Sequence, residues 1–216
     1  MKGGNFMAKK KATIHTKGLR GISNIHFAPL STEGEYSAPE PITLAKKIEN
    51  KLKYEGSQEW ADNMIVDSSF LYAGGEGKLE VIGLSIIEQI LLFGNNAAKG
   101  GVYVTDSDEA PEGAYIFEMQ KKNGHRRLYV VYNCKNSPTD IKSETIEDGK
   151  AEWQTNEIEF QIGSLNKDGV NYIYFFVDTD AEDAVQEQIT NWYKTVQFPQ
   201  NPSPLGFNEV KAKKAA

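Results

Sequence analysis

This chain of 216 residues is poor in the side chains that most often carry catalysis or bind metals. It has one cysteine, Cys134, so an internal disulfide is excluded. Its three histidines stand at positions 15, 26 and 125, and none has a second histidine at metal-ligand spacing. No Gly-x-Ser-x-Gly nucleophile motif is present. The sequence therefore predicts no enzymatic activity, no cofactor and no metal site.

Long apolar runs are also missing. The longest, Ile86–Phe93, is interrupted by Glu88 and Gln89 and is far shorter than the roughly 20 residues of a membrane span. The N-terminus is basic but lacks the apolar segment of a signal peptide. We therefore expect no membrane partner, and a chain that stays or assembles in the cytoplasm in which it is made.

Two short motifs could be mistaken for ligand sites. The run Gly74–Gly77 lacks the lysine of a phosphate-binding loop, and its Glu76 would repel phosphate, so a plain turn is expected. Asp178, Asp180, Glu182 and Asp183 form an acidic cluster, but its spacing does not fit a calcium-binding EF-hand. Their negative charge is expected to favour the start of a helix instead.

Charge is distributed unevenly along the chain. The first 20 residues hold six Lys or Arg and no acids, and residues 211–216 hold three more lysines. The body between them has fifteen basic and thirty acidic residues. Such a body repels nucleic acid. Ordinary solubility explains this charge, and so does a surface that lets DNA pass without binding it.

Short β-rich runs separated by turn residues predict a mainly antiparallel β fold with flanking helices, either a sandwich or a barrel. Asn123-Gly124 between residues 114–120 and 126–134 indicates a hairpin. Asp168-Gly169 predicts a second hairpin, between 158–165 and 170–178. The remaining expected strands are 19–29, a lysine-rich edge strand at 42–54 (alternatively a helix over 44–53), 77–83, and a pair at 141–146 and 150–154.

Two helices are expected. Ser85 and Glu88 form a capping-box pattern, and Gly94 stands at the C′ position, which predicts a helix over 85–93 that packs on a sheet. The second is an amphipathic helix over 181–196 with Asp180 as its N-cap.

Residues 55–77 are polar and glycine-rich but contain several aromatic side chains, and we expect a long loop here. Long loops without structure are uncommon in compact domains. The aromatic residues indicate either contact with something outside the monomer or a hairpin folded back over the core.

Four segments occur in the order seen in one known family: 18–30, 42–45, 60–63 and 77–93. Together they resemble the major tail proteins, or tail tube proteins, of long-tailed phages and prophages of Gram-positive bacteria. The resemblance implies a tail-tube-like β-sandwich or barrel with a packed helix. It also implies a structural virion protein that forms stacked hexameric rings around a DNA channel and joins its inner sheet to those of its neighbours.

The resemblance also implies an organisation and a set of partners. Residues 1–17 would be a flexible basic arm, 18–205 the tail tube domain and 206–216 a basic tail. Within the domain, 49–77 would be the inter-subunit loop, 85–93 the flanking helix, and parts of 114–134 and 158–177 would face the channel. The partners would be tape-measure, baseplate and tail-terminator proteins, in a tail assembled in the host cytoplasm. The implied contact residues are Tyr54, Trp60, Asp62, Asn63, Met64, Val66, Phe70 and Tyr72.

Two alternatives stay open. The first is the tube subunit of a contractile injection or secretion machine, which a sheath partner would distinguish. The second is a monomeric ligand-binding β-sandwich with a pocket rimmed by Trp60, Trp153 or Trp192.

Overall fold

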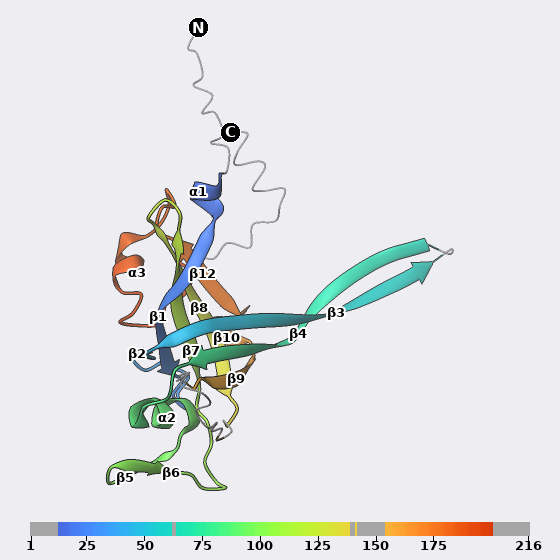
Figure 1. The fold of residues 1–216 in the computed structure, drawn as a ribbon. Coiled ribbons are helices and arrows are strands. Elements are labelled where there is room, and N and C mark those ends of the chain that lie inside the picture. Colours follow the sequence, from blue (N-terminus) through green and yellow to red (C-terminus); the bar gives the residue numbers. More distant parts are fainter. Residues whose placement is uncertain (1–12, 62–63, 139–140, 142–153, 201–216) are drawn as a thin grey trace, which may run out of the picture.

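The fold is a bent antiparallel sheet with short helices around it, and one hairpin of the sheet projects far from the rest (Figure 1). The structure is a computed structural model, and it describes residues 13–61, 64–138, 141 and 154–200. The elements are α1 (Ile14–Lys17), β1 (Leu19–Pro29), β2 (Glu40–Pro41), β3 (Ala45–Ala61), β4 (Met64–Val81), α2 (Ile86–Phe93), β5 (Asn96–Ala98), β6 (Gly101–Tyr103), β7 (Glu112–Lys121), β8 (Arg126–Asn136), β9 (Asn156–Ile162), β10 (Leu165–Lys167), β11 (Val170–Tyr172), β12 (Tyr174–Asp178) and α3 (Gln186–Thr190).

The sheet bends within β8, which divides it into two half-sheets. Residues 127–131 of β8 pair with β12, whereas residues 134–136 pair with β9. Between them Asn133 has a left-handed backbone with φ of 47°, a conformation that bends a strand. The first half-sheet contains β2, β1, β7, the start of β8 and β12. The second contains the end of β8, then β9, β4 and β3.

The main core lies between the two half-sheets. Phe27 and Tyr115 from the first face Leu79 and Phe160 from the second, and all four side chains are buried. Helix α2 closes one end with Leu92 and Phe93. This arrangement is a β-sandwich with a packed helix, as the sequence predicts.

A second core covers the outer face of β7 and β8. Ile116, Val130 and Tyr132 pack there against Trp192, which follows α3 and is 1% exposed. Both faces of these two strands are therefore occupied over most of their length. The expectation that parts of 114–134 face a channel does not fit most of β7 and β8, because both faces of these strands are buried over most of their length.

Helix α2 begins and ends where its capping signals predict. The Ser85 hydroxyl accepts a hydrogen bond from the Glu88 backbone amide, and Gly94 is left-handed with φ of 67°. Glu88 also accepts bonds from the backbone and hydroxyl of Thr43, at 2.7 and 3.0 Å. The side chain that caps the helix thereby fixes it to the chain entering β3.

The lysine-rich edge strand expected at 42–54 is confirmed from Ala45 onward, which excludes the alternative helix, and β3 lies at the edge of the sheet. Two other secondary-structure predictions need correction. The turn at Asp168-Gly169 joins only β10 and β11, because β9 pairs with β4 and β12 pairs with β8. The predicted helix over 181–196 is reduced to α3, whose N-cap is Val185.

Among the other predicted segments, the hairpin of β7 and β8 and the strand at 19–29 are confirmed. The pair expected at 141–146 and 150–154 lies almost entirely outside the described residues, as do residues 1–12 and 201–216. Residues 14–17, expected within a flexible arm, form the short helix α1. In the described part of the chain, none of the helices has the length and apolar character needed to span a membrane.

Candidate assembly interface

The segment expected to be a loop, 55–77, is instead the distal part of a long hairpin. Strands β3 and β4 pair out to Ala61 and Met64, with register shifts at Leu52/Tyr54 and Glu59/Trp60, which leaves only positions 62 and 63 between them. Beyond the Tyr54–Tyr72 pair the ribbon extends away from both half-sheets, so it is neither irregular nor folded back over the core (Figure 1). We call residues 54–61 and 64–72 the arm.

The base of the arm is anchored to the body. The Tyr72 hydroxyl donates a 2.7 Å hydrogen bond to the Ile162 carbonyl, and the Tyr54 and Tyr72 rings meet edge to face at 5.7 Å. Tyr72 is correspondingly half-buried, whereas Tyr54 is exposed. These contacts fix the direction in which the arm leaves the sheet.

Large apolar side chains on the arm are exposed on both of its faces. Phe70 pairs with Gly56 and lies so close to it that a Cβ there would be 2.9 Å from the ring. Leu71, the next residue, points to the opposite face by strand alternation. The exposed fractions are 75% for Phe70, 70% for Leu71, 65% for Met64, 52% for Tyr54 and 48% for Ile65. An isolated two-stranded ribbon with this surface gains stability only when another surface covers it.

The predicted contact residues divide into three groups. Tyr54, Met64, Phe70 and Tyr72 all lie on the arm. For Trp60 and Val66 the structure describes the backbone, which lies near the end of the ribbon. Asp62 and Asn63 are outside the described residues. The sequence-based set omits Ile65 and Leu71, which are also exposed on the arm.

The outward face of the second half-sheet is covered with alternating charges. Register places Glu49, Lys78 and Glu159 in one row across β3, β4 and β9, and Lys51, Glu76 and Gln161 in the next. Lys78 pairs with Glu157 at 2.6 Å and with Glu159 at 2.8 Å, and Lys53 pairs with Glu76. The hydrogen bonds that Lys78 donates to the two glutamates raise its pKa, and the bond that Lys53 donates lowers the pKa of Glu76.

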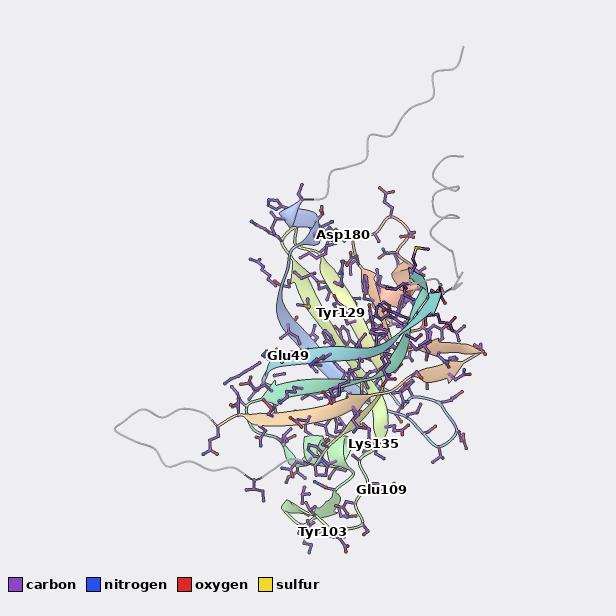
Figure 2. All side chains as sticks on the ribbon, turned by 90° about the vertical axis from the view of Figure 1, so that its right-hand side faces the viewer. Glu49, Tyr103, Glu109, Tyr129, Lys135 and Asp180 are labelled. Carbon is purple, nitrogen blue, oxygen red and sulfur yellow. The ribbon has the colours of Figure 1, made fainter. Side chains whose placement is uncertain are left out.

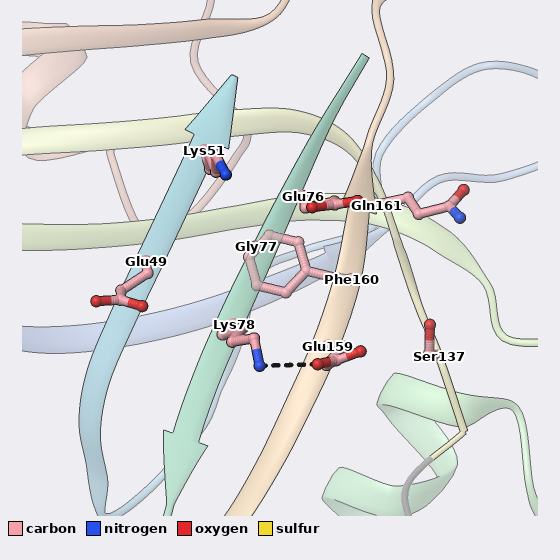
Figure 3. A pocket seen from close by; sticks show the side chains of 9 residues that line it. All are labelled: Glu49, Lys51, Glu76, Gly77, Lys78, Ser137, Glu159, Phe160 and Gln161. Atoms are coloured by element: carbon pink, nitrogen blue, oxygen red, sulfur yellow. Dashed lines mark ion pairs between the residues drawn. The ribbon is translucent and has the colours of Figure 1, made fainter. Parts of the chain in front are cut away.

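A shallow depression of about 400 Å³ lies on this charged face (Figure 3). It is lined by Glu49, Lys51, Glu76, Gly77, Lys78, Ser137, Glu159, Phe160 and Gln161. The lining brings no histidine or cysteine to these carboxylates, and its positive and negative charges lie next to each other. Paired in this way, the lysines do not form a continuous cationic track for a polyanion.

The acidic cluster near residue 180 is engaged in ion pairs. Arg127 donates two bonds to Asp178, at 2.5 and 2.8 Å, and Lys121, whose side chain is 4% exposed, contacts Asp178 and Asp180 at 3.2 and 2.5 Å. Asn123 also donates to Asp180, which is why Asp180 does not cap a helix. Over the described residues, no group of side chains suited to holding a metal ion is found.

Replacing Asp178 by asparagine tests this cluster. The bonds from Arg127 hold the pKa of Asp178 below its ordinary value. Burial alone would raise the pKa of Asp180, but the bonds from Lys121 and Asn123 outweigh it, so that pKa is lowered too. A lowered folded-state pKa contributes stability that is present above the unfolded-state pKa, near 4, and lost as the pH falls through the folded-state value. We expect Asp178→Asn to reduce the free energy of unfolding at pH 7 by about 2 kcal/mol.

Urea unfolding at pH 7 and pH 3 measures this effect. The difference between wild type and Asp178→Asn should shrink at the lower pH, because pH 3 lies below the ordinary carboxyl pKa, so the unfolded wild-type chain takes up a proton more readily than folded Asp178 does. Asp168→Asn, in the exposed turn of β10 and β11, is the control and should leave stability unchanged at both pH values. An equal loss at both pH values would contradict the ionic role of Asp178.

The other described side chains that could take part in catalysis or ligand binding are either far from one another or buried. Cys134 is fully buried in β8, and this burial raises the pKa of its thiol. His26 packs its ring on Tyr193 at 4.7 Å, whereas His15 is in α1 and His125 follows the Asn123-Gly124 turn. Trp192 is buried in the second core, so it cannot rim a ligand pocket, and Trp153 lies outside the described residues.

Comparison with known proteins identifies no family by sequence. No family model matches the chain, and no curated protein matches it. Among solved structures, a chain of the PVC sheath–tube complex of an extracellular contractile injection system, in its extended state, aligns with a TM-score of 0.45 and 7% identity. That alignment covers 80% of this chain and 100% of the other.

A chain of the anti-feeding prophage (AFP) baseplate aligns with a TM-score of 0.38 and 9% identity, over 73% of this chain and 95% of the other. Both likenesses concern the arrangement of the strands. At these scores, neither identifies a function for this chain.

Proposed function

We propose that this protein is a structural subunit that polymerises through its arm, and that the polymer is the tail tube of a long-tailed phage or prophage. The observation that carries the proposal is the arm itself. It is a β-ribbon anchored at Tyr72, and it presents Phe70, Leu71 and Met64 to solvent. A subunit that works alone gains nothing from this exposed surface, whereas a subunit that joins its copies buries it.

The free edge of the second half-sheet supports the same proposal. Strand β3 is the last strand of the half-sheet, and its partner on one side is β4. A long edge strand promotes pairing with other chains unless it is covered or charged. Lys47, Lys51 and Lys53 protect this edge from unspecific pairing, while a neighbouring subunit of fixed orientation can still approach it. A closed ring of subunits removes such edges.

The charged face of the second half-sheet fits the wall of a channel. Its outward side chains are hydrophilic, and the cross-strand pairs of Lys78 and Lys53 neutralise the lysines locally. A polyanion gains little from such a wall, since binding to phosphates depends on unpaired cations that release counterions. DNA would pass along it without being held. In this proposal the channel is lined by β3, β4 and β9 in place of β7 and β8.

Negative-stain electron microscopy of concentrated protein, with the particle mass measured alongside, tests the proposal. We expect hollow tubes built from stacked rings, with six subunits in each ring. Particles that stay monomeric at high concentration, and also after addition of tail-initiation proteins, would contradict it.

A further inference from the structure

The two half-sheets cover each other incompletely, and this mismatch points to the place where the arm binds. The inner face of the second half-sheet continues beyond the body as one face of the arm. Leu52, at the end of the core, is followed on the same face of β3 by Tyr54 and then by Gly56 with its partner Phe70, because the register shift between Leu52 and Tyr54 adds its extra residue to β4. From Tyr54 outward, no part of the first half-sheet lies opposite to cover this face.

The first half-sheet also has an inner face that is only partly covered. Register places Phe117, Tyr129 and Phe176 in one row across β7, β8 and β12, with ring centroids 5.0 and 5.6 Å apart. Phe117 is 4% exposed, but Phe176 is 40% exposed and the neighbouring Tyr174 is 48% exposed. The inner face of this half-sheet is therefore covered at β7 and uncovered at β12. Tyr129, labelled in Figure 2, pairs with Phe117 on one side and Phe176 on the other, so it is the middle residue of the row.

The arm is acidic, and cations unpaired within the described part of the chain lie at one end of the half-sheet that carries the aromatic row. Residues 54–72 contain four acidic residues and no basic one. At the end of the first half-sheet beyond the aromatic row, Lys17, Arg20 and Lys122 are exposed and form no ion pair with other described residues. Opposite charges at the borders of two apolar faces favour one orientation of contact.

We propose that the arm of one copy docks on the aromatic patch formed by Tyr129, Tyr174 and Phe176 of a second copy. The contact completes the sandwich of the second copy with the arm of the first. Each chain carries one arm and one patch, so the contact is head-to-tail and repeats from subunit to subunit, as rings and tubes require. This inference rests on the proposed self-assembly and adds the receiving surface to it.

Phe176→Ser tests the patch. The ring is partly exposed at the edge of β12, so its loss should leave the subunit folded, which thermal unfolding followed by circular dichroism can verify. We expect the critical concentration for assembly, measured by sedimentation, to rise at least about tenfold. Val170→Ser is the matched control, because Val170 is 42% exposed but lies on β11, away from the patch. An unchanged critical concentration for Phe176→Ser would overturn the proposal.

Cross-linking of mixed subunits identifies the occupant. Phe70→Cys and Phe176→Cys proteins that carry different tags are mixed, assembled and treated with a flexible bis-maleimide. Wild type is the control for the reagent and should not react, because its single cysteine, Cys134, is buried. A product containing both tags, absent when Val170→Cys replaces Phe176→Cys, is expected. A chain that carries both Phe70→Cys and Phe176→Cys is treated in the same way. If it cross-links only within single molecules, the arm folds on its own body, and the proposal is overturned. Wild-type protein that never assembles would contradict the proposed function itself, whereas assembly insensitive to Phe176 would contradict only the docking site.

Discussion

Replacing residues 55–71 by an Asn-Gly turn is expected to give a folded subunit that no longer assembles. The substitution keeps the Tyr54–Tyr72 pair and its bond to Ile162, so the ribbon closes where it leaves the body. Asn-Gly is the preferred sequence for a two-residue hairpin turn. None of the deleted side chains that the structure describes belongs to either core. The expected critical concentration rises by about a hundredfold or more, since several exposed apolar side chains are lost at once.

Sedimentation and electron microscopy of this shortened protein measure the effect. Its thermal midpoint should stay within a few degrees of wild type, because the arm adds little to the body. Ser57→Ala is the matched control on the arm: the Ser57 and Ser69 hydroxyls bond each other at 2.8 Å in an exposed pair, so their loss should affect assembly little. If the shortened protein forms tubes at the critical concentration of wild type, the arm is not needed for assembly.

The contrast between α2 and the arm shows what the sequence could predict. Helix α2 is encoded locally: Ser85, Glu88 and Gly94 satisfy its ends from within a few residues. The arm has no such local signal. A half-buried strand alternates polar and apolar residues because one of its faces meets a core, but the arm is exposed on both faces and its glycine and serine residues resemble a loop. Its position in the sequence was predictable, but its form as a paired ribbon was not.

The error at residues 158–178 has a different physical cause. Asp168-Gly169 does form a turn, but only three residues on each side pair across it. Gly163 donates to the Asn133 carbonyl at the bend of β8, and Phe175 packs on Trp192 in the second core. These contacts join residues far apart in the chain, and they outweigh the local preference for a longer hairpin. The short α3 follows the same rule, since Lys121 and Asn123 take the carboxylate that was expected to cap it.

Gly77→Val is expected to be the most destabilising single substitution we describe, by about 3 kcal/mol or more. Gly77 lies in the middle of β4, opposite Phe160 of β9, and a Cβ there would be 2.1 Å from two atoms of the Phe160 ring. Phe160 is 2% exposed and its ring contacts Tyr115 at 4.6 Å, so it cannot move without disturbing the main core. Strand propensity alone predicts the opposite result, because valine is favoured in strands and glycine is not.

Gly101→Val separates these two effects. Gly101 is also in a strand, β6, and nothing lies within 4 Å of the position that its Cβ would occupy. Chemical unfolding should give Gly101→Val a stability equal to or slightly above wild type, and Gly77→Val a much lower urea midpoint. Equal stability of the two variants would mean that the Phe160 ring does not lie across β4. Because this ring fills the space above Gly77, the inner face of the second half-sheet stays flat enough to close on the first, while the outer face keeps its charged rows for the proposed channel wall.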